Sequence, residues 1–156
     1  MRSEIAIGSS APLGATVQPD GVNFSVYSKS ASLVELLLFD NQDDIKPAQV
    51  IVLDAEKHRT YHYWHLRVPD VKSGQLYGFR ATGEFKPEQG LRFDRSKVLL
   101  DPYGLAVAIP KAYSRTGSDT PAMKSIVGCD PPRGWCGRPR QRQNQRRWER
   151  PLPPRC

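Results

Sequence analysis

The sequence predicts an all-β protein, an immunoglobulin-like antiparallel β-sandwich followed by a C-terminal irregular extension. Short runs of apolar residues alternating with polar ones begin near residues 21, 33, 49, 61 and 75, and this alternation is the period of half-buried strands. Helical periodicity is nowhere sustained. The spacing of about 12–16 residues between runs leaves no length for crossover helices, so neighbouring strands should be antiparallel.

The first two runs differ in pattern. Residues 21–28 alternate apolar and polar side chains after the turn at residues 18–21, which predicts a strand with one buried face. Residues 33–39 are apolar at nearly every position except Glu35. That pattern favours a strand covered on both faces, for example by another domain.

The later runs are strands of the same kind. Residues 49–53 are rich in β-branched side chains, residues 61–68 hold the longest alternation, and residues 75–82 follow after a turn. One face of the longest run carries three apolar side chains, Trp64, Leu66 and Val68. We therefore expect Trp64 in the core rather than as an exposed sugar-stacking platform.

Composition divides the chain into three parts. We assign residues 10–103 to the sandwich and residues 104–127, after a short apolar run at 97–100, to a connector. Residues 128–156 contain eight Arg and six Pro, carry a charge of +6 out of the total +7, and hold all three Cys. Such a segment cannot bury enough apolar surface to order itself, so we predict a disordered tail. The body is nearly neutral and without a disulfide framework.

Length and composition also limit the function. A chain of 156 residues has room for one ordinary domain but not for a (β/α)₈ barrel of about 250 residues. We expect no signal peptide, because residues 1–11 lack an apolar run, and no membrane span, because no apolar stretch reaches 18 residues. The cytoplasm is the expected compartment.

Three segments carry motifs in a fixed order. They are Pro12-Leu13-Gly14-Ala15 with residues 21–28 and 34–40, then Trp64-His65 with Val68-Pro69 and residues 74–80, then Arg92-Phe93-Asp94 with residues 97–103. Together they resemble the N-terminal domain of isoamylase-type and glycogen-debranching enzymes. That domain is a carbohydrate-binding-module family 48 sandwich attached to a family 13 glycoside hydrolase.

The resemblance implies a parent enzyme that hydrolyses α-1,6 branch linkages of glycogen or starch by a retaining two-carboxylate mechanism. A branching or maltooligosyl-trehalose parent stays an alternative. This chain would be a non-catalytic module, and we assign it no catalytic residue, metal or cofactor. Its implied partners are α-glucan (glycogen, starch or maltooligosaccharide), bound weakly, and the catalytic barrel of the parent enzyme.

Tyr27 and Tyr63 are the candidates for carbohydrate contact, because both fall on the polar faces of their strands and aromatic rings pack on sugars. By contrast, residues 78–82 (Gly-Phe-Arg-Ala-Thr) resemble the barrel motif that contains the nucleophile. Thr82 stands where that motif has Asp, so we interpret the segment as an ordinary strand.

Histidines and cysteines do not predict a metal site. His62 and His65 should point to opposite faces of one strand, with no carboxylate to complete a ligand set. Cys129 and Cys136 have no matching pair downstream.

The arginines at residues 138–147 leave a second hypothesis open, a protein that binds nucleic acid non-specifically through its basic tail. A third is a non-functional truncated gene product whose tail from about residue 128 is read out of frame. Translation of the other two reading frames tests that idea.

Overall fold

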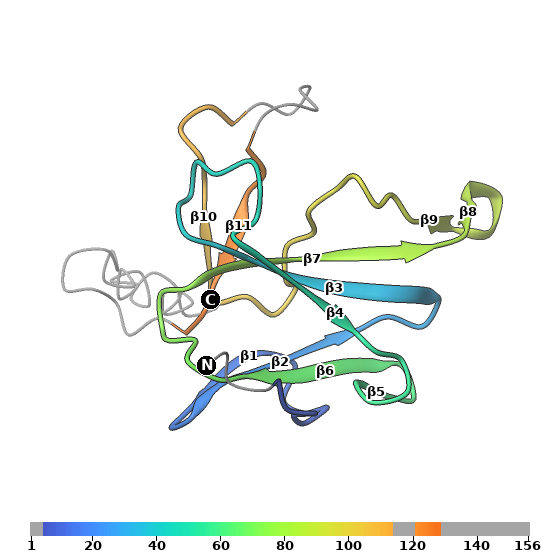
Figure 1. Ribbon diagram of the computed structural model, residues 1–156. Helices are drawn as coiled ribbons and strands as arrows, with labels where there is room; N and C mark the ends of the chain where they lie inside the picture. Colours follow the sequence, from blue (N-terminus) through green and yellow to red (C-terminus); the bar gives the residue numbers. More distant parts are fainter. Residues whose placement is uncertain (1–4, 114–120, 129–156) are drawn as a thin grey trace, which may run out of the picture.

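The computed structural model describes residues 5–113 and 121–128, which form two antiparallel sheets packed face to face (Figure 1). The four-stranded sheet, in the order β1-β2-β6-β5, comprises β1 (Gly14–Gln18), β2 (Gly21–Tyr27), β6 (Tyr63–Val68) and β5 (Arg59–Thr60). The five-stranded sheet, in the order β10-β11-β7-β3-β4, comprises β10 (Ala106–Ala108), β11 (Lys124–Ile126), β7 (Leu76–Gly83), β3 (Ala31–Phe39) and β4 (Gln49–Leu53). The predicted all-β sandwich is confirmed.

A small hairpin extends from the end of β7. It consists of β8 (Phe85–Lys86) and β9 (Leu91–Arg92), joined through the 3₁₀ turn η1 (Pro87–Gln89). Gly90 ends the turn in the left-handed conformation, φ 77°, which glycine adopts without steric cost. In the described part of the chain, no helix is long and apolar enough to span a membrane.

The core lies between the sheets and follows from the alternation in the sequence. Phe24 of β2 faces Leu66 of β6, and the Phe24 ring meets Tyr77 of β7 edge to face at 5.0 Å. Trp64 is completely buried, as predicted. Burial of each of these side chains contributes roughly 1.5–3 kcal/mol relative to exposure, so the core provides the main stabilisation of the sandwich.

Strand β6 begins two residues later than the alternation predicts. Tyr61 has φ 59°, a left-handed conformation that a strand residue does not adopt. Residues 61–68 alternate in sequence, but a turn occupies the first two positions and the strand covers Tyr63–Val68.

Both faces of β3 are buried, as its apolar pattern predicts, but the chain itself supplies the second cover. Leu37 and Phe39 belong to the outward face and are fully buried. Residues 97–100, the short apolar run noted in the sequence, lie against β7. Phe79 and Leu99 exchange two backbone hydrogen bonds there, of 2.7 and 2.8 Å. A Cβ on Gly78 would lie 2.6 Å from Val98. No second domain is therefore needed to cover β3.

The N-terminal residues close the outer face of the four-stranded sheet. Residues 6–10 run from β6 to β2, where the Asn23 amide exchanges two hydrogen bonds with the Ser9 backbone, of 2.7 and 2.9 Å. Ser25 donates to the Ser10 carbonyl. Positions expected to face water are therefore buried.

The sandwich also ends later than predicted. The boundary at residue 103 lies inside the fold, because β11 pairs with β7 and β10 pairs with β11. Val127 is fully buried in the core. Residues 104–127, predicted as a connector, thus contribute two strands. Each has only three residues, too few for an alternation to be recognised. The predicted tail lies outside the described residues, except for Gly128.

Lys124 of β11 holds the loop that follows β3. Its side chain is completely buried, and Nζ donates to the carbonyls of Gln42 and Asp44 at 2.6 and 2.8 Å. The ammonium also lies 4.7 Å from the centre of the Phe39 ring, a cation–π contact. Burial lowers the pKa of Lys124, against the opposing attraction of nearby carboxylates.

Candidate functional site

Tyr27 and Tyr63, the two residues predicted to contact glycan, lie opposite each other on neighbouring strands. They pair in the register of β2 with β6, so both side chains share the outer face of that sheet. Their ring centroids are 5.4 Å apart at an angle of 65°, an edge-to-face arrangement. Tyr27 is half exposed and Tyr63 is partly buried. The structure thus brings the two predicted residues together.

Two further rings extend this pair. The Tyr61 ring stands 3.8 Å from the His62 ring, which is 6.1 Å from that of Tyr27. Tyr61 is 77% exposed in its left-handed conformation, an uncommon backbone geometry that often marks functional positions. We call Tyr27, Tyr61, His62 and Tyr63 the aromatic cluster. The sequence signal that could have identified Tyr61 is the run Tyr-His-Tyr at residues 61–63, in which Tyr61 has the same parity as Tyr63.

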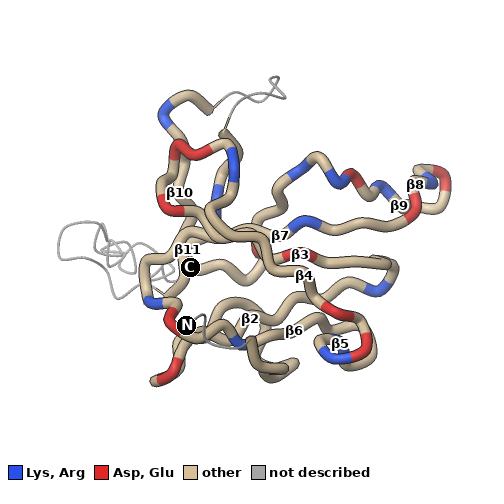
Figure 2. The backbone as a smooth tube through the Cα atoms, viewed as in Figure 1, with Lys and Arg blue, Asp and Glu red and all other residues tan. Residues whose placement is uncertain are grey.

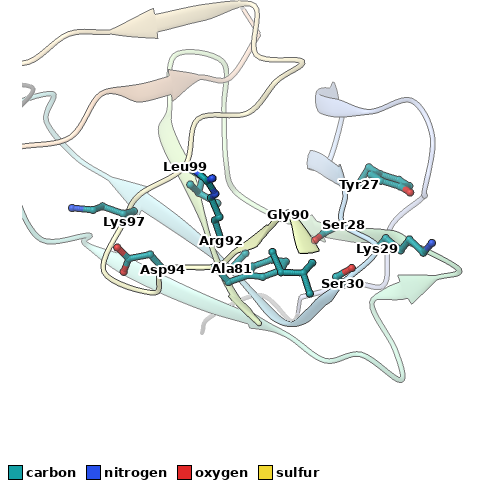
Figure 3. Close-up of a pocket in the computed structure, with 12 residues that line it drawn as sticks. Tyr27, Ser28, Lys29, Ser30, Ala81, Gly90, Arg92, Asp94, Lys97 and Leu99 are labelled. Atoms are coloured by element: carbon teal, nitrogen blue, oxygen red, sulfur yellow. The ribbon is translucent and has the colours of Figure 1, made fainter. Parts of the chain in front are cut away.

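A groove of about 480 Å³ begins at Tyr27. Figure 3 shows Tyr27 and residues 28–30 on one side, with Arg92, Asp94, Lys97 and Leu99 on the other. Ala81 of β7 and Phe93 also line the groove. A Cβ on Gly83 would lie 2.6 Å from the Phe93 ring. We call this site the Tyr27 groove.

The wall formed by residues 28–30 is fixed by the core beneath it. The indole Nε1 of Trp64 donates to the Ser28 carbonyl at 3.1 Å, and Arg59 donates to the Lys29 carbonyl at 3.2 Å. The Arg59 guanidinium lies 5.0 Å from the centre of the Trp64 ring. The backbone N–H of Ser28 also donates to the backbone carbonyl of His62 at 2.9 Å. This wall is therefore preorganised, and it is linked to the aromatic cluster.

The polar groups of the Tyr27 groove carry both signs of charge. Lys29, Arg92 and Lys97 are exposed. The Asp94 carboxylate accepts hydrogen bonds from the Ser96 hydroxyl and backbone N–H at 2.7 and 2.8 Å, and these bonds lower its pKa. Figure 2 shows the two signs interspersed along the loops of the molecule, so the described body presents a mixed surface.

The remaining candidates have structural roles. Residues 78–82 lie inside β7, where Arg80 pairs with Glu35 of β3. The His65 ring is held by the Ile7 carbonyl and the Thr60 hydroxyl. In residues 5–113 and 121–128, no three His, Cys, Asp or Glu side chains gather as a metal-binding group. Cys129 and Cys136 lie outside the described residues.

The arrangement offers chemical groups that a sugar can contact. Aromatic rings can pack on the apolar faces of pyranose rings, and the neighbouring Ser, Lys, Arg and Asp groups can exchange hydrogen bonds with hydroxyls. Among the described residues that line the groove, Asp94 alone carries a carboxylate.

One known family and several known proteins match the sequence of this chain over most of its described length. The family model of carbohydrate-binding module 48, the isoamylase N-terminal domain, matches residues 12–104. A glycogen debranching enzyme of Serratia proteamaculans is 44% identical over 122 residues, which cover 76% of this chain and 18% of that enzyme. The chloroplastic isoamylase 1 of Arabidopsis thaliana is 38% identical over 128 residues, covering 79% and 16%. The chain thus spans less than a fifth of the length of these relatives.

Solved structures share the fold at low sequence identity. The pullulanase of group B Streptococcus has a TM-score of 0.56 with 19% identity, covering 78% of this chain and 15% of its own. The pullulanase of Bacillus acidopullulyticus has a TM-score of 0.55, also with 19% identity, covering 77% and 12%.

Proposed function

Because the chain belongs to the carbohydrate-binding module 48 family, that of the isoamylase N-terminal domain, we propose that it is a non-catalytic, α-glucan-associated module of a debranching enzyme. Its parent would hydrolyse α-1,6-glucosidic branch linkages of glycogen or starch. The names of the Serratia and Arabidopsis relatives support this parent activity. The relatives' length beyond the matched part would hold the catalytic domain.

The observation that carries the proposed glucan contact is the aromatic cluster beside the Tyr27 groove. Tyr27 belongs to both, with its ring 5.4 Å from Tyr63 and on the wall held by Trp64. A preorganised site loses little entropy on binding. A sugar stacked on the cluster could therefore place its neighbour in the groove, among the side chains of Lys29, Arg92 and Asp94.

Sedimentation with glycogen tests this function. We expect the 156-residue chain to be retained weakly, and Tyr27→Ala and Tyr63→Ala each to reduce the retained fraction severalfold, since stacking on one ring contributes about 1 kcal/mol. Tyr113→Ala, which removes an exposed tyrosine elsewhere, is the matched control. Equal retention of all four proteins, or no retention of the wild type, would reject glucan binding by the isolated module.

The family assignment and the relatives favour this function over a nucleic-acid-binding protein. Retention on RNA that depends on salt and disappears when residues 128–156 are removed would reverse that preference. For the compartment we retain the cytoplasm as a proposal, and localisation of the tagged chain by fractionation tests it.

A further inference from the structure

One wall of the Tyr27 groove is formed by residues 90–99. Phe93 and Leu99 attach this wall to β7 near its two ends. The charged groups that it presents to the groove, Asp94 and Lys97, lie on the loop between these two attachments (Figure 3). The position of both groups therefore depends on what holds this loop.

The loop is a turn closed by local hydrogen bonds. The Asp94 carbonyl accepts the backbone N–H of Lys97 at 3.2 Å, and the Asp94 carboxylate accepts the backbone N–H and the hydroxyl of Ser96. We call residues 94–97 the Asp94 turn. Its own bonds define the shape of the turn but not its place relative to the sheets. Arg95, the second residue of the turn, supplies a bond to the sandwich.

The Arg95 side chain reaches a carboxylate on the outer face of the five-stranded sheet. Its Nη2 donates to Glu35 Oε1 at 3.3 Å. Leu99 bonds to the edge of β7 that does not pair with β3, whereas Glu35 belongs to β3, so the Arg95 side chain crosses β7 to make this contact. The Glu35 side chain is only 5% exposed and that of Arg95 is 62% exposed. The exposed turn is thus joined to a buried group of a central strand.

The Glu35 carboxylate has two arginine neighbours of unequal closeness. Arg80, its partner in the strand register, lies 3.6 Å from Oε2, beyond the usual hydrogen-bonding distance. Within the described part of the chain, Glu35 Oε2 and Arg80 Nε have no hydrogen-bond partner. Burial of a carboxylate is costly, and apolar side chains in place of a buried ion pair often hold a fold equally well. The distinctive contribution of this ion pair is therefore the fixed position of Arg95.

We propose that Glu35 is a positioning residue of the Tyr27 groove and acts through Arg95. The ion pair holds the Asp94 turn against the sheet, and so keeps Asp94 and Lys97 opposite the wall that contains Tyr27, where one glucan chain contacts both walls. The proposal rests on the proposed function, since it takes α-glucan as the ligand of the groove. A wall that is ordered before binding reduces the entropy lost when the glucan binds.

Backbone order in the ligand-free chain tests the ion pair first. In the ¹⁵N-labelled 156-residue chain we expect order parameters of about 0.85 in the Asp94 turn. Arg95→Gln removes the charge and should lower them below about 0.6, whereas Arg95→Lys should keep most of the order. Arg67→Gln, which breaks an exposed ion pair of 3.0 Å with Asp20, is the matched control. Order unchanged by Arg95→Gln, or lost equally in Arg67→Gln, would overturn the proposal.

Affinity for maltoheptaose then tests whether this order matters for binding. Arg95→Gln should raise the Kd about three- to tenfold, because the glucan must now order the wall. Arg95→Lys should restore most of the affinity, and Arg67→Gln should leave it unchanged. An unchanged Kd in Arg95→Gln would overturn the positioning role alone. Titration of the wild type without saturation would reject the proposed function together with this role, even where the turn is ordered.

A double variant tests whether Glu35 acts through Arg95. Glu35→Gln alone should also weaken maltoheptaose binding, and the addition of Arg95→Gln should weaken it no further, since both changes break the same contact. Losses that multiply would show that the two residues act separately and would overturn the proposal. Urea unfolding of each variant gives its folded fraction, so that a loss of affinity is distinguished from a loss of fold.

Discussion

The indole Nε1 of Trp64 donates a hydrogen bond to the carbonyl oxygen of Ser28 across 3.1 Å. Trp64 is fully buried between the sheets, and Ser28 lines the Tyr27 groove. A core side chain therefore determines the position of a groove wall. This relationship joins the stability of the sandwich to the geometry of its candidate binding site.

Replacement of Trp64 by Phe keeps an aromatic ring in the core but removes the indole donor. We expect the free energy of unfolding to fall by about 1–3 kcal/mol, because the Ser28 carbonyl loses its partner and the smaller ring leaves a cavity. Urea unfolding measures this change. Tyr113→Phe should change stability by less than about 0.5 kcal/mol. A Trp64→Phe chain as stable as the wild type would show that the bond does not hold the wall.

A buried and an exposed glutamate, each with ion-pair partners, should contribute differently to the free energy of unfolding. The buried Glu35 carboxylate lies between Arg80, at 3.6 Å, and Arg95, at 3.3 Å. The Glu84–Lys86 pair is shorter, 2.7 Å, but exposed. We expect Glu35→Gln to reduce the free energy of unfolding by about 1–3 kcal/mol and Glu84→Gln by at most about 0.5 kcal/mol. Equal losses in urea unfolding would refute the role of burial.

Lys124→Met should destabilise the fold, because the carbonyls of Gln42 and Asp44 lose the ammonium donor inside the protein. The expected loss in free energy of unfolding is about 1–3 kcal/mol. Lys111→Met is the matched control, since Lys111 is exposed and binds Asp43 through its backbone N–H. Hydrogen exchange at residues 41–45 should accelerate in the Lys124→Met variant only. Unchanged exchange there would contradict the proposal that Lys124 holds this loop.

Tyr77 should make the fold sensitive to alkali. Burial and the hydrogen bond from its hydroxyl to Asp101 raise the pKa of Tyr77 well above its usual range. The folded chain keeps this proton above pH 10, whereas the unfolded chain releases it, so stability falls as pH rises above about 10.

The Tyr77→Phe variant tests that dependence. It should be less stable than the wild type at pH 8, and the difference should shrink by about 1.4 kcal/mol for each pH unit above 10. Lys124 titrates in both proteins, so its effect cancels in the difference. Urea unfolding at pH 8, 10 and 11 supplies the values, and a difference independent of pH would contradict the raised pKa.

The parts of the fold that could be predicted are those with a repeated local pattern. The strands at residues 21–28 and 49–53 were identified because each has alternating or β-branched side chains and sufficient length. Strands β10 and β11 were not, since three residues carry no period and their pairing with β7 depends on contacts distant in sequence. The polar residue Asn23 gave no sign that it binds the Ser9 backbone rather than water.

The candidate site was predicted in part for the same reason. Tyr27 and Tyr63 were selected from strand parity, and their contact follows from the β2–β6 register. Tyr61 has the same parity as Tyr63 but was not selected, and the alternation gives no sign of the left-handed turn in which its ring is exposed. The opposite wall of the groove belongs to residues 90–99, in which the strand β9 has only two residues. This segment is anchored to β7 through Phe93 and Leu99.

Titration of the ¹⁵N-labelled 156-residue chain with maltoheptaose, followed by amide chemical shifts, tests most directly whether this module contacts α-glucan at the aromatic cluster and the Tyr27 groove. We predict saturable shifts at residues 27–30, 61–63 and 90–97 that disappear in Tyr27→Ala and persist in Tyr113→Ala. The absence of saturable shifts in the wild-type chain, or shifts that survive Tyr27→Ala, would contradict this account.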